Sequence, residues 1–370
     1  MEFYEIYVVY RMIQNAIGFY SSRLIILFLV LLLFVLILFT GCISTKMQGQ
    51  ETGNVSFGHS LIVNDSYGHT VNLDNPIKRI ISLPGTATEA LITIGAGNNV
   101  VGVSNMTIKE NNIMDKLPFA ESVGDYWIPD IEKIISLNPD IIISYGINQS
   151  KPQNNDKLLK SGIPLLYVKF YDINELPSEM RMLGRITGHE SKAERYAQYN
   201  EKYLALVKER LDNMSSNESQ QPRVFFERWT DYTAMAKDSP YNDLITSFHA
   251  KNIAGNISMV SCEVSPEWII EQNPNVIFRL AIEGENTSEV RDSIISRPGA
   301  TNIQAVQKGK VYVIQTDMIS SPHAVSGYIY MAKALYPDLF QDLDPEAISH
   351  EYAREFLPGT DRADSFSPSL

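Results

Sequence analysis

Motifs for the common enzyme chemistries are missing from this chain of 370 residues. It contains no His-Glu-x-x-His, no Gly-x-Ser-x-Gly and no Gly-x-x-x-x-Gly-Lys-(Ser/Thr), and its six histidines are scattered. The stretch GAGNNVVG includes Gly-x-Gly, but it follows a helical pattern and precedes a strand pattern, the reverse of a dinucleotide fingerprint. We therefore predict that the protein is not an enzyme and has no intrinsic cofactor. A surface enzyme stays as the alternative from another class.

Positive charge and cysteine are also scarce. The chain has 31 Lys and Arg against 43 Asp and Glu, a net charge of −12, which argues against nucleic acid and anionic membrane surfaces as partners. Its two cysteines are Cys42 and Cys262. Because Cys42 has the separate explanation given next, Cys262 has no partner for an internal disulfide. We expect Cys262 to be a small buried apolar residue.

A long apolar run stands at the front of the chain. Residues 24–39 (LIILFLVLLLFVLILF) follow Arg11 and Arg23 and would rise about 24 Å as a helix, slightly short for a bilayer span. The run leads into Leu-Phe-Thr-Gly-Cys, ending at Cys42. This ending resembles the lipobox of exported lipoproteins, which implies cleavage before Cys42 and lipidation of its thiol. An uncleaved signal anchor is the alternative, and either segment is a targeting signal.

The remaining chain reads as an exported protein. We expect a monomer on the outer face of the cell membrane, held there by a lipid or a signal anchor and by a polar tether at 42–56. Sequons for N-linked glycans are frequent and support an exported, glycosylated surface. They begin at Asn54, Asn64, Asn105, Asn148, Asn213, Asn217, Asn256 and Asn286.

Short apolar β-branched runs alternate with helical segments, which predicts α/β lobes with mainly parallel sheets. In the first half, strands are expected at 79–83, 100–103, 140–145 and 165–169, with helices at 86–94, 130–137 and 151–161. In the second half, strands are expected near 223–228, 275–280 and 310–315, with helices near 241–249, 266–272 and 324–335.

One long helix is predicted between the two halves. Apolar residues recur at helical spacing over 190–212, and neither Pro nor Gly interrupts them, so this connection should be stiff and about 34 Å long. About 330 residues follow Cys42, enough for two lobes with a core each. The predicted boundaries are an export segment at 1–41, a tether at 42–56, an N-terminal lobe at 57–177, a helical region at 178–212, a C-terminal lobe at 213–357 and a tail at 358–370.

A helix–turn–strand unit is written once in each half. EKIISLNPDIII at 132–143 recurs as EWIIEQNPNVIF at 267–278, each time opening on a glutamate. Ser265 and Pro266 suit the start of the second helix, and a first-turn glutamate stabilises a helix through its dipole. Thr86 and Glu89 likewise have the spacing of a capping box, so Glu89 is assigned to capping. Capping alone does not explain why the whole unit recurs.

Five segments carry a family resemblance, and they span about residues 57–357. They resemble the substrate-binding proteins of iron-complex and cobalamin ABC importers, which implies two α/β lobes joined by one rigid helix, with the ligand held between them. The resemblance also implies that Glu132 and Glu267 dock onto the membrane permease, through which an ATPase drives transport. The segments are RIISLPGTATEALITIGAGNNVVGVS, IPDIEKIISLNPDIIIS, SPEWIIEQNPNVIF, RPGATNIQAVQKGKVYVI and IYMAKALYPDLFQDLDPEAISHEYAREFL.

Most candidate ligand contacts lie at or after the carboxyl ends of the expected strands, where such lobes meet their ligands, and Arg297 opens the segment RPGATN. Aromatic side chains would offer flat contact with a large ligand, and arginines would suit anionic oxygens of a ferric complex. Packing aromatics and surface arginines are the plainer alternatives. The candidates are Tyr126, Trp127, Tyr145, Arg228, Trp229, Tyr232, Arg279 and Arg297.

The stretch SSPHAVSG departs from the family pattern, in which Gly-Pro-Arg is common before the last core helix. His323 stands near the place of that arginine, and it is a ninth candidate contact, although a lone histidine is more often structural. The preferred ligand is a ferric siderophore-like chelate. Cobalamin, haem, and molybdate or tungstate are the alternatives, together with a sensor domain that does not transport.

Overall fold

The computed structural model describes residues 60–74, 77–109, 111–146, 151–214, 221–282 and 284–358. The apolar run at 24–39, Cys42 and the tether at 42–56 lie outside these ranges, as do Asn54, Asn148, Asn217 and the tail from residue 359. No helix within the described ranges is long and apolar enough to cross a membrane.

The first lobe is built on a parallel five-stranded sheet in the order β5-β4-β3-β6-β7. Ile80 of β3 pairs with Val100 of β4 and with Ile141 of β6. The strands are β3 (Ile80–Ser82), β4 (Val100–Val103), β5 (Glu121–Ser122), β6 (Ile141–Tyr145) and β7 (Leu165–Val168). A hairpin of β1 (Ser60–Asn64) and β2 (Thr70–Asp74) precedes the sheet. The helices of the first lobe are α3 (Gly85–Thr93), α4 (Asn105–Lys109), α5 (Asn111–Met114), α6 (Ile131–Ser136) and α7 (Asn155–Lys160).

The second lobe has a mixed six-stranded sheet in the order β11-β9-β8-β12-β13, with β10 also paired to β8. The strands predicted from sequence run parallel, whereas β9 and β11 add antiparallel pairs. The strands are β8 (Arg223–Glu227), β9 (Thr233–Met235), β10 (Lys251–Asn252), β11 (Ser261–Glu263), β12 (Val276–Ala281) and β13 (Val311–Gln315). The helical segments are α10 (Pro240–Ser247), α11 (Pro266–Gln272), α12 (Thr287–Ile295), η3 (Ala300–Asn302), α13 (Gln304–Gln307) and η4 (Thr316–Ile319).

Alternation along the buried strands places the cores on both faces of each sheet. Ile80 of β3 belongs to a large core that continues through both lobes, whereas its neighbour Ile81 belongs to a smaller core on the other face. In the second lobe, Phe278 of β12 joins the large core and Ile277 joins a separate one. Each sheet is therefore covered on both sides.

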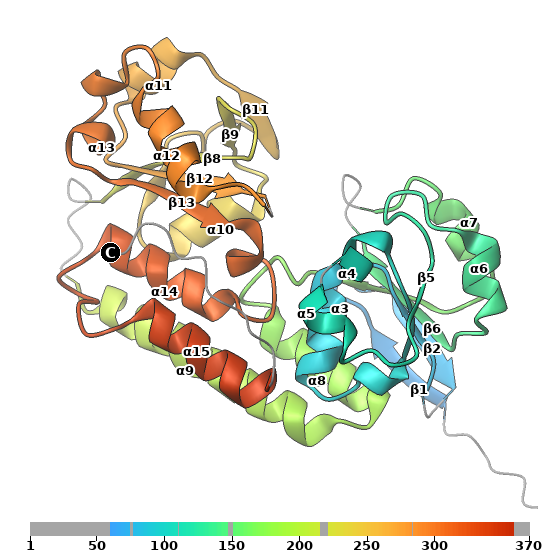
Figure 1. The fold of residues 1–370 in the computed structure, drawn as a ribbon. Helices are drawn as coiled ribbons and strands as arrows, with labels where there is room; N and C mark the ends of the chain where they lie inside the picture. Colours follow the sequence, from blue (N-terminus) through green and yellow to red (C-terminus); the bar gives the residue numbers. More distant parts are fainter. Residues whose placement is uncertain are drawn as a thin grey trace, which may run out of the picture. The chain divides into compact units, whose positions relative to one another are not determined.

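The predicted connecting helix is α9 (Glu190–Asp212). It follows α8 (Leu176–Thr187), and Figure 1 shows α14 (Ala324–Leu335) and α15 (Pro345–Phe356) lying along it. Tyr196 donates a hydrogen bond of 2.7 Å from its hydroxyl to the carbonyl of Pro322, and Tyr199 donates one of 2.9 Å to the carbonyl of Ile348. These bonds fix α9 to the helices of the second lobe, while α8 and α3 pack against it from the first.

The repeated unit has a structural explanation in both lobes. Each short helix is followed by an asparagine in the left-handed region, Asn138 at φ 45° and Asn273 at φ 42°, where asparagine is tolerated better than most residues. The proline that follows stops the helix. The unit therefore recurs partly because the same backbone turn is made twice.

An arginine from the first strand region of each lobe completes this turn. Arg79 donates from its guanidinium to the carbonyl of Leu137 at 2.6 Å and from its backbone N–H to Asp140 at 2.8 Å. Arg223 donates to the carbonyl of Gln272 at 2.5 Å and from its N–H to Asn275 at 2.8 Å. We call these two arrangements the arginine clasps. They tie the end of α6 to the strand region of β3 and the end of α11 to that of β8.

Two expectations from sequence are wrong. The N-cap of α3 is Pro84, no side chain caps the helix, and its first turn contains no acidic residue, so Thr86 and Glu89 do not form a capping box. Cys262 lies on β11 and is half-buried rather than buried, and burial raises the pKa of its thiol.

The sequon asparagines within the described ranges are all exposed, namely Asn64, Asn105, Asn213, Asn256 and Asn286.

Candidate ligand-binding site

The first lobe carries a wall of aromatic side chains at the carboxyl ends of its strands. Tyr145 is the last residue of β6, and Tyr126 and Trp127 lie in the loop after β5. The ring centroids of Tyr126 and Trp127 are 5.1 Å apart, and those of Tyr126 and Tyr145 are 6.2 Å apart, both edge to face. Such pairs stabilise one another beyond their burial. The structure therefore brings together the three aromatic residues that the sequence singled out. Trp127 is exposed, Tyr145 is half-buried and Tyr126 is buried in the core.

Two further tyrosines extend this wall and were not predicted. Tyr171 follows β7, and its ring centroid is 6.0 Å from that of Tyr145. Its hydroxyl lies 2.8 Å from the hydroxyl of Tyr67, which comes from the turn of the β1–β2 hairpin. Thr86 hydrogen-bonds to the hydroxyl of Tyr145. Burial raises the pKa of Tyr126, Tyr145 and Tyr171, so all three keep their phenol protons near neutral pH. We name Tyr67, Tyr126, Trp127, Tyr145 and Tyr171 the aromatic wall.

The buried carboxyl group of Glu179 holds the backbone segments next to the aromatic wall. Glu179 lies in the first turn of α8 and accepts hydrogen bonds from the hydroxyl of Ser66 and from the backbone N–H of Lys169. Burial raises the pKa of Glu179 to about 8, against the lowering effect of those two bonds. Lys169 also places its ammonium group 4.8 Å from the ring centre of Tyr67. The only sequence signal for Glu179 was a glutamate one turn inside an otherwise amphipathic helix.

In the second lobe, the loop after β8 is organised around one buried carboxylate. Glu227 is the last residue of β8 and has no solvent exposure. Arg297 donates to it at 2.8 and 3.1 Å, and the Nε of Arg279 lies 3.2 Å from its Oε2. Asp231 adds contacts of 2.9 Å to Arg297 and 3.6 Å to Arg279. The two arginines therefore face two carboxylates, and the cluster is close to neutral.

This cluster holds the candidate contacts of the loop in place. Arg279 donates to the carbonyl of Trp229 at 2.6 Å, and Glu227 accepts from the backbone N–H of Tyr232 at 2.7 Å. Tyr232 has φ 58°, and its ring centre lies 4.6 Å from the guanidinium carbon of Arg297. Left-handed backbone is costly for a bulky residue, and the buried ion cluster compensates for it. Arg279, Arg297 and Tyr232 are thus positioned as supports of this loop.

Arg228 differs from the other two arginines. Its guanidinium carbon lies 3.9 Å from the ring centre of Trp229, a cation–π contact. Its Nε is buried and has no hydrogen-bond partner among the described residues, and no carboxylate among them pairs with it. Burial lowers the pKa of its guanidinium, although an arginine stays charged at neutral pH. Arg228 with Trp229, which is 37% exposed, forms a cationic and aromatic surface at the end of β8.

His323 lies between the lobes. Its Nδ1 is 2.9 Å from Oε1 of Glu89 on α3 and 2.6 Å from the hydroxyl of Ser321. Its Nε2 is 3.5 Å from Asp317. Tyr352 of α15 also donates to Glu89, at 3.0 Å. Both His323 and Glu89 are buried, and the structure places them in one polar bridge between α3 and the helices of the second lobe.

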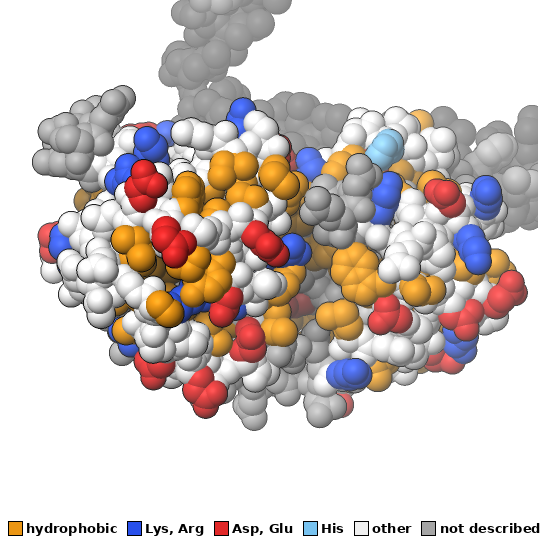
Figure 2. Space-filling model, turned by 90° about the horizontal axis from the view of Figure 1, so that it is seen from above, with side chains coloured by type: hydrophobic (Ala, Val, Ile, Leu, Met, Phe, Trp, Pro, Cys, Tyr) orange, Lys and Arg blue, Asp and Glu red, His pale blue; other side chains and the backbone are white. Residues whose placement is uncertain are grey.

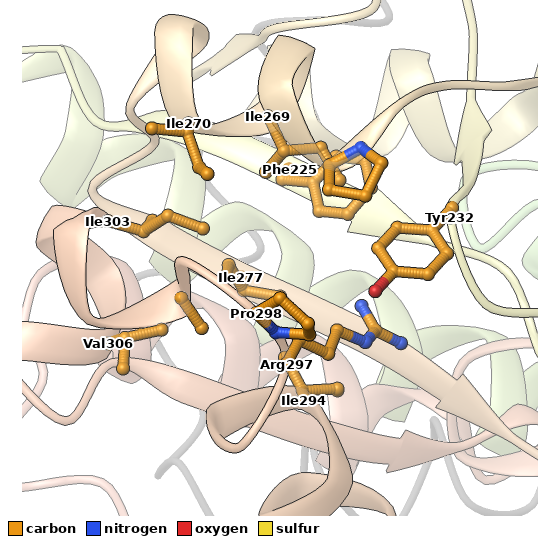
Figure 3. A pocket seen from close by; sticks show the side chains of 12 residues that line it. Phe225, Tyr232, Ile269, Ile270, Ile277, Ile294, Arg297, Pro298, Ile303 and Val306 are labelled. Atoms are coloured by element: carbon orange, nitrogen blue, oxygen red, sulfur yellow. The ribbon is translucent and has the colours of Figure 1, made fainter.

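Hydrophobic side chains, among which tyrosine is counted, lie on the surfaces of both lobes on either side of the hollow that separates them (Figure 2). A small, largely apolar pocket lies beneath α11. The candidate contacts Tyr232 and Arg297 line it together with Phe225, Ile277 and Pro298 (Figure 3). Its interior volume of about 20 Å³ is close to the space of a single water molecule. A metal chelate cannot enter it, so the strand-end surfaces are the better candidate site.

The predicted docking glutamates occupy matching positions. Glu132 and Glu267 lie in the first turns of α6 and α11, and both are exposed. Asp130 and Ser265 cap these helices by accepting from the backbone N–H groups of Lys133 and Trp268. Because other residues make the caps, neither glutamate is needed for that purpose. Neither has a hydrogen bond or ion pair within the described part of the chain.

Comparisons with known proteins agree with this architecture. The chain is 27% identical over 284 residues to YvrC of Bacillus subtilis, an uncharacterised ABC transporter substrate-binding lipoprotein, covering 76% of this chain and 87% of that protein. It is 22% identical to a vitamin B12-binding protein of Vibrio parahaemolyticus, covering 67% and 85%. The crystal structure of Helicobacter pylori CeuE in complex with Ni-His has a similar fold, with a TM-score of 0.66 at 18% identity, covering 80% and 95%.

The family assignment rests on the match to a family model. The model for the periplasmic binding protein family matches residues 80–318, from the start of β3 to η4 and through both sheets. The two α/β lobes, the single rigid helix α9 and the matching positions of α6 and α11 fit that assignment. The chain therefore belongs to the periplasmic binding protein family.

Proposed function

We propose that this protein is the substrate-binding component of an ABC importer, which captures a bulky metal chelate of low net charge and delivers it to a permease. Two features together carry the proposal. One lobe has the aromatic wall, and the other has a nearly neutral cluster of Glu227, Asp231, Arg279 and Arg297 near the end of β8, which we call the strand-end cluster. Aromatic faces suit large, partly apolar ligands. Only Arg228 is left as a cation without a carboxylate partner among the described residues at that strand end.

The charge balance supports a ligand of low net charge. A multiply anionic catecholate complex would favour several unpaired arginines, but Arg279 and Arg297 already face Glu227 and Asp231. If either arginine left its carboxylate partner to bind a ligand, Glu227 would stay buried with fewer partners, at a cost of several kcal/mol. A cobalamin-type corrinoid is therefore our first candidate, and the vitamin B12-binding relative supports it. A ferric chelate of low charge, such as a hydroxamate, is the second.

Ligand binding can be measured through the tryptophans. Two of the three, Trp127 and Trp229, lie in the candidate site, whereas Trp268 lies on α11. We would titrate the full-length protein in mild detergent with hydroxocobalamin, ferric hydroxamate, haem and molybdate, correcting the fluorescence for absorption by the ligand. Quenching should be saturable for a metal chelate, should fall in Trp127→Phe and Trp229→Phe, and should persist in Trp268→Phe. Saturable binding of molybdate alone would rule out the chelate proposal.

Delivery should depend on the exposed glutamates of α6 and α11. Their carboxylates have no partner within the described residues. The helix that carries each glutamate is fixed to its lobe by an arginine clasp. Two carboxylates on separate lobes would let a basic permease surface orient the protein. The variant Glu132→Arg/Glu267→Arg should abolish uptake while ligand affinity in vitro stays unchanged. The same reversals at the exposed Glu209 and Glu346 serve as the control, and normal uptake by the first variant would contradict docking.

A further inference from the structure

A second pocket opens where the two lobes meet α9. It has a volume of about 200 Å³ and lies between the end of α3, Lys116 of the first lobe, the first turns of α9, and the end of α15 with the residues after it. A water molecule occupies about 30 Å³ of liquid, so the pocket has room for a tetrahedral oxyanion and several waters. It is distinct from the aromatic wall, and none of its lining residues takes part in the strand-end cluster of the second lobe.

Positive charge converges on this pocket. Lys116, Lys192 and Arg195 line it, and Glu355 is the only carboxylate among its lining residues. The pocket therefore carries an excess of two positive charges in a chain whose net charge is −12. Lys192 and Arg195 are one turn apart on α9, which puts them on one face of that helix. Neither makes a hydrogen bond or an ion pair with another described residue.

One of these cations is held in position by a backbone carbonyl, and a second lies close to the backbone. The ammonium group of Lys116 donates at 2.7 Å to the carbonyl of Pro358, which fixes it at the rim and leaves two of its protons for another acceptor. The ammonium group of Lys192 lies against Gly95, where an added Cβ would be only 2.5 Å from the nitrogen. Gly95 has φ +86° and follows α3, which favours glycine there, and a larger residue would move the end of the Lys192 side chain aside.

We propose that this pocket binds a phosphate-type oxyanion, either free phosphate or the phosphate of a lipid headgroup. The guanidinium of Arg195 can form a two-pronged contact with such a group, and the two lysines add point charges around it. A divalent anion would balance the excess charge of the pocket. The apolar side chains of Ile92 and Phe356 in the lining leave a place for the carbon of a phosphate ester. Because the lining comes from both lobes and α9, the bound anion joins the three parts.

The test uses the full-length protein in a mild detergent at low ionic strength, in a buffer without phosphate. Isothermal titration with inorganic phosphate and with glycerol 1-phosphate, a soluble model of a lipid headgroup, should give saturable binding for at least one of them. Stronger binding of inorganic phosphate identifies the free anion as the source, and stronger binding of the ester identifies the headgroup. The melting temperature should rise with concentration of the anion that binds.

The variant Lys192→Gln/Arg195→Gln should weaken binding at least tenfold. Both side chains are exposed, so the variant should fold, and its melting temperature without anion serves to check this. The control Lys237→Gln/Lys251→Gln removes the same charge from exposed positions outside the pocket and should bind like the wild type. Arg195→Lys should bind more weakly than the wild type but better than the double variant. The proposal is overturned if neither anion binds saturably, or if both double variants bind equally.

Discussion

Replacing Glu179 by glutamine should change how the stability of this protein depends on pH. Glu179 is buried behind the aromatic wall, and its Oε2 has no hydrogen-bond partner among the described residues. Its pKa is raised from 4.5 to about 8, mainly because burial disfavours the charged form. Glutamine has the same shape and cannot ionise, so Glu179→Gln imitates the protonated carboxyl group at every pH.

The direction follows from the two pKa values. Between pH 4.5 and about 8, the folded protein keeps a proton on Glu179 that the unfolded chain has lost. The free energy of unfolding therefore falls as pH rises through this window, and the contribution is fully present only below pH 4.5. A shift from 4.5 to about 8, at about 1.36 kcal/mol for each pH unit, gives an upper limit of about 5 kcal/mol. Water entering the site would reduce it.

Urea unfolding of the full-length protein at pH 5, 6.5, 8 and 9 measures this effect. The difference in unfolding free energy between Glu179→Gln and the wild type should increase by several kcal/mol from pH 5 to pH 9. Other titrating groups are common to both proteins and cancel in the difference. Glu209→Gln, an exposed replacement on α9, should follow the wild type at every pH. Parallel curves for Glu179→Gln and the wild type would refute the assignment of a raised pKa.

Three further stability predictions use the same unfolding measurement. Glu89→Ala removes the acceptor of His323 and Tyr352 from the bridge between the lobes and should cost about 3 kcal/mol, and a loss below about 1 kcal/mol would contradict a buried bridge. Arg297→Met should cost about 3–5 kcal/mol because it leaves Glu227 buried with fewer partners, and retention of full stability would show that Arg279 suffices. Asn273→Ala should cost about 1–2 kcal/mol at its φ of 42°, whereas Asn273→Gly should cost less, and the opposite order would refute the left-handed turn.

Much of the fold could be predicted because its signals are local. The helix at 190–212 was expected at the bounds where α9 is found, since its periodicity and its lack of Gly and Pro act within the helix itself. The longer parallel strands were predicted as apolar runs, whereas the two-residue parallel strands β5 and β10 were not predicted. By contrast, β9 and β11 contain three residues each, too few for a clear pattern, and they depend on pairing, β9 with β8 and β11 with β9.

The sequence predicted residues of the candidate site but not the partners that hold them. The strand-end rule placed Tyr126, Tyr145 and Arg228 at or after strand ends, because it needs only the order of strands and loops. Arg297 instead follows helix α12. The partners of these residues were not legible. Arg297 meets Glu227 at a separation of 70 positions, and His323 meets Glu89 at a separation of 234. Such contacts depend on how the lobes fold together. One signal was available in the sequence. Glu89 stands in the otherwise uncharged segment of α3, and a charged residue in such a buried helix needs a polar partner.

The arginine clasps affect how related sequences should be compared. Arg79 with Asp140, and Arg223 with Asn275, complete a turn of the backbone, so selection for folding alone is enough to keep them. A descendant that had lost transport would therefore still carry most of the repeated unit. The outward glutamate of each copy takes no part in that turn. Under the proposed docking role, its loss alongside an intact clasp would mark a lineage in which the lobes still fold but no longer dock onto a permease.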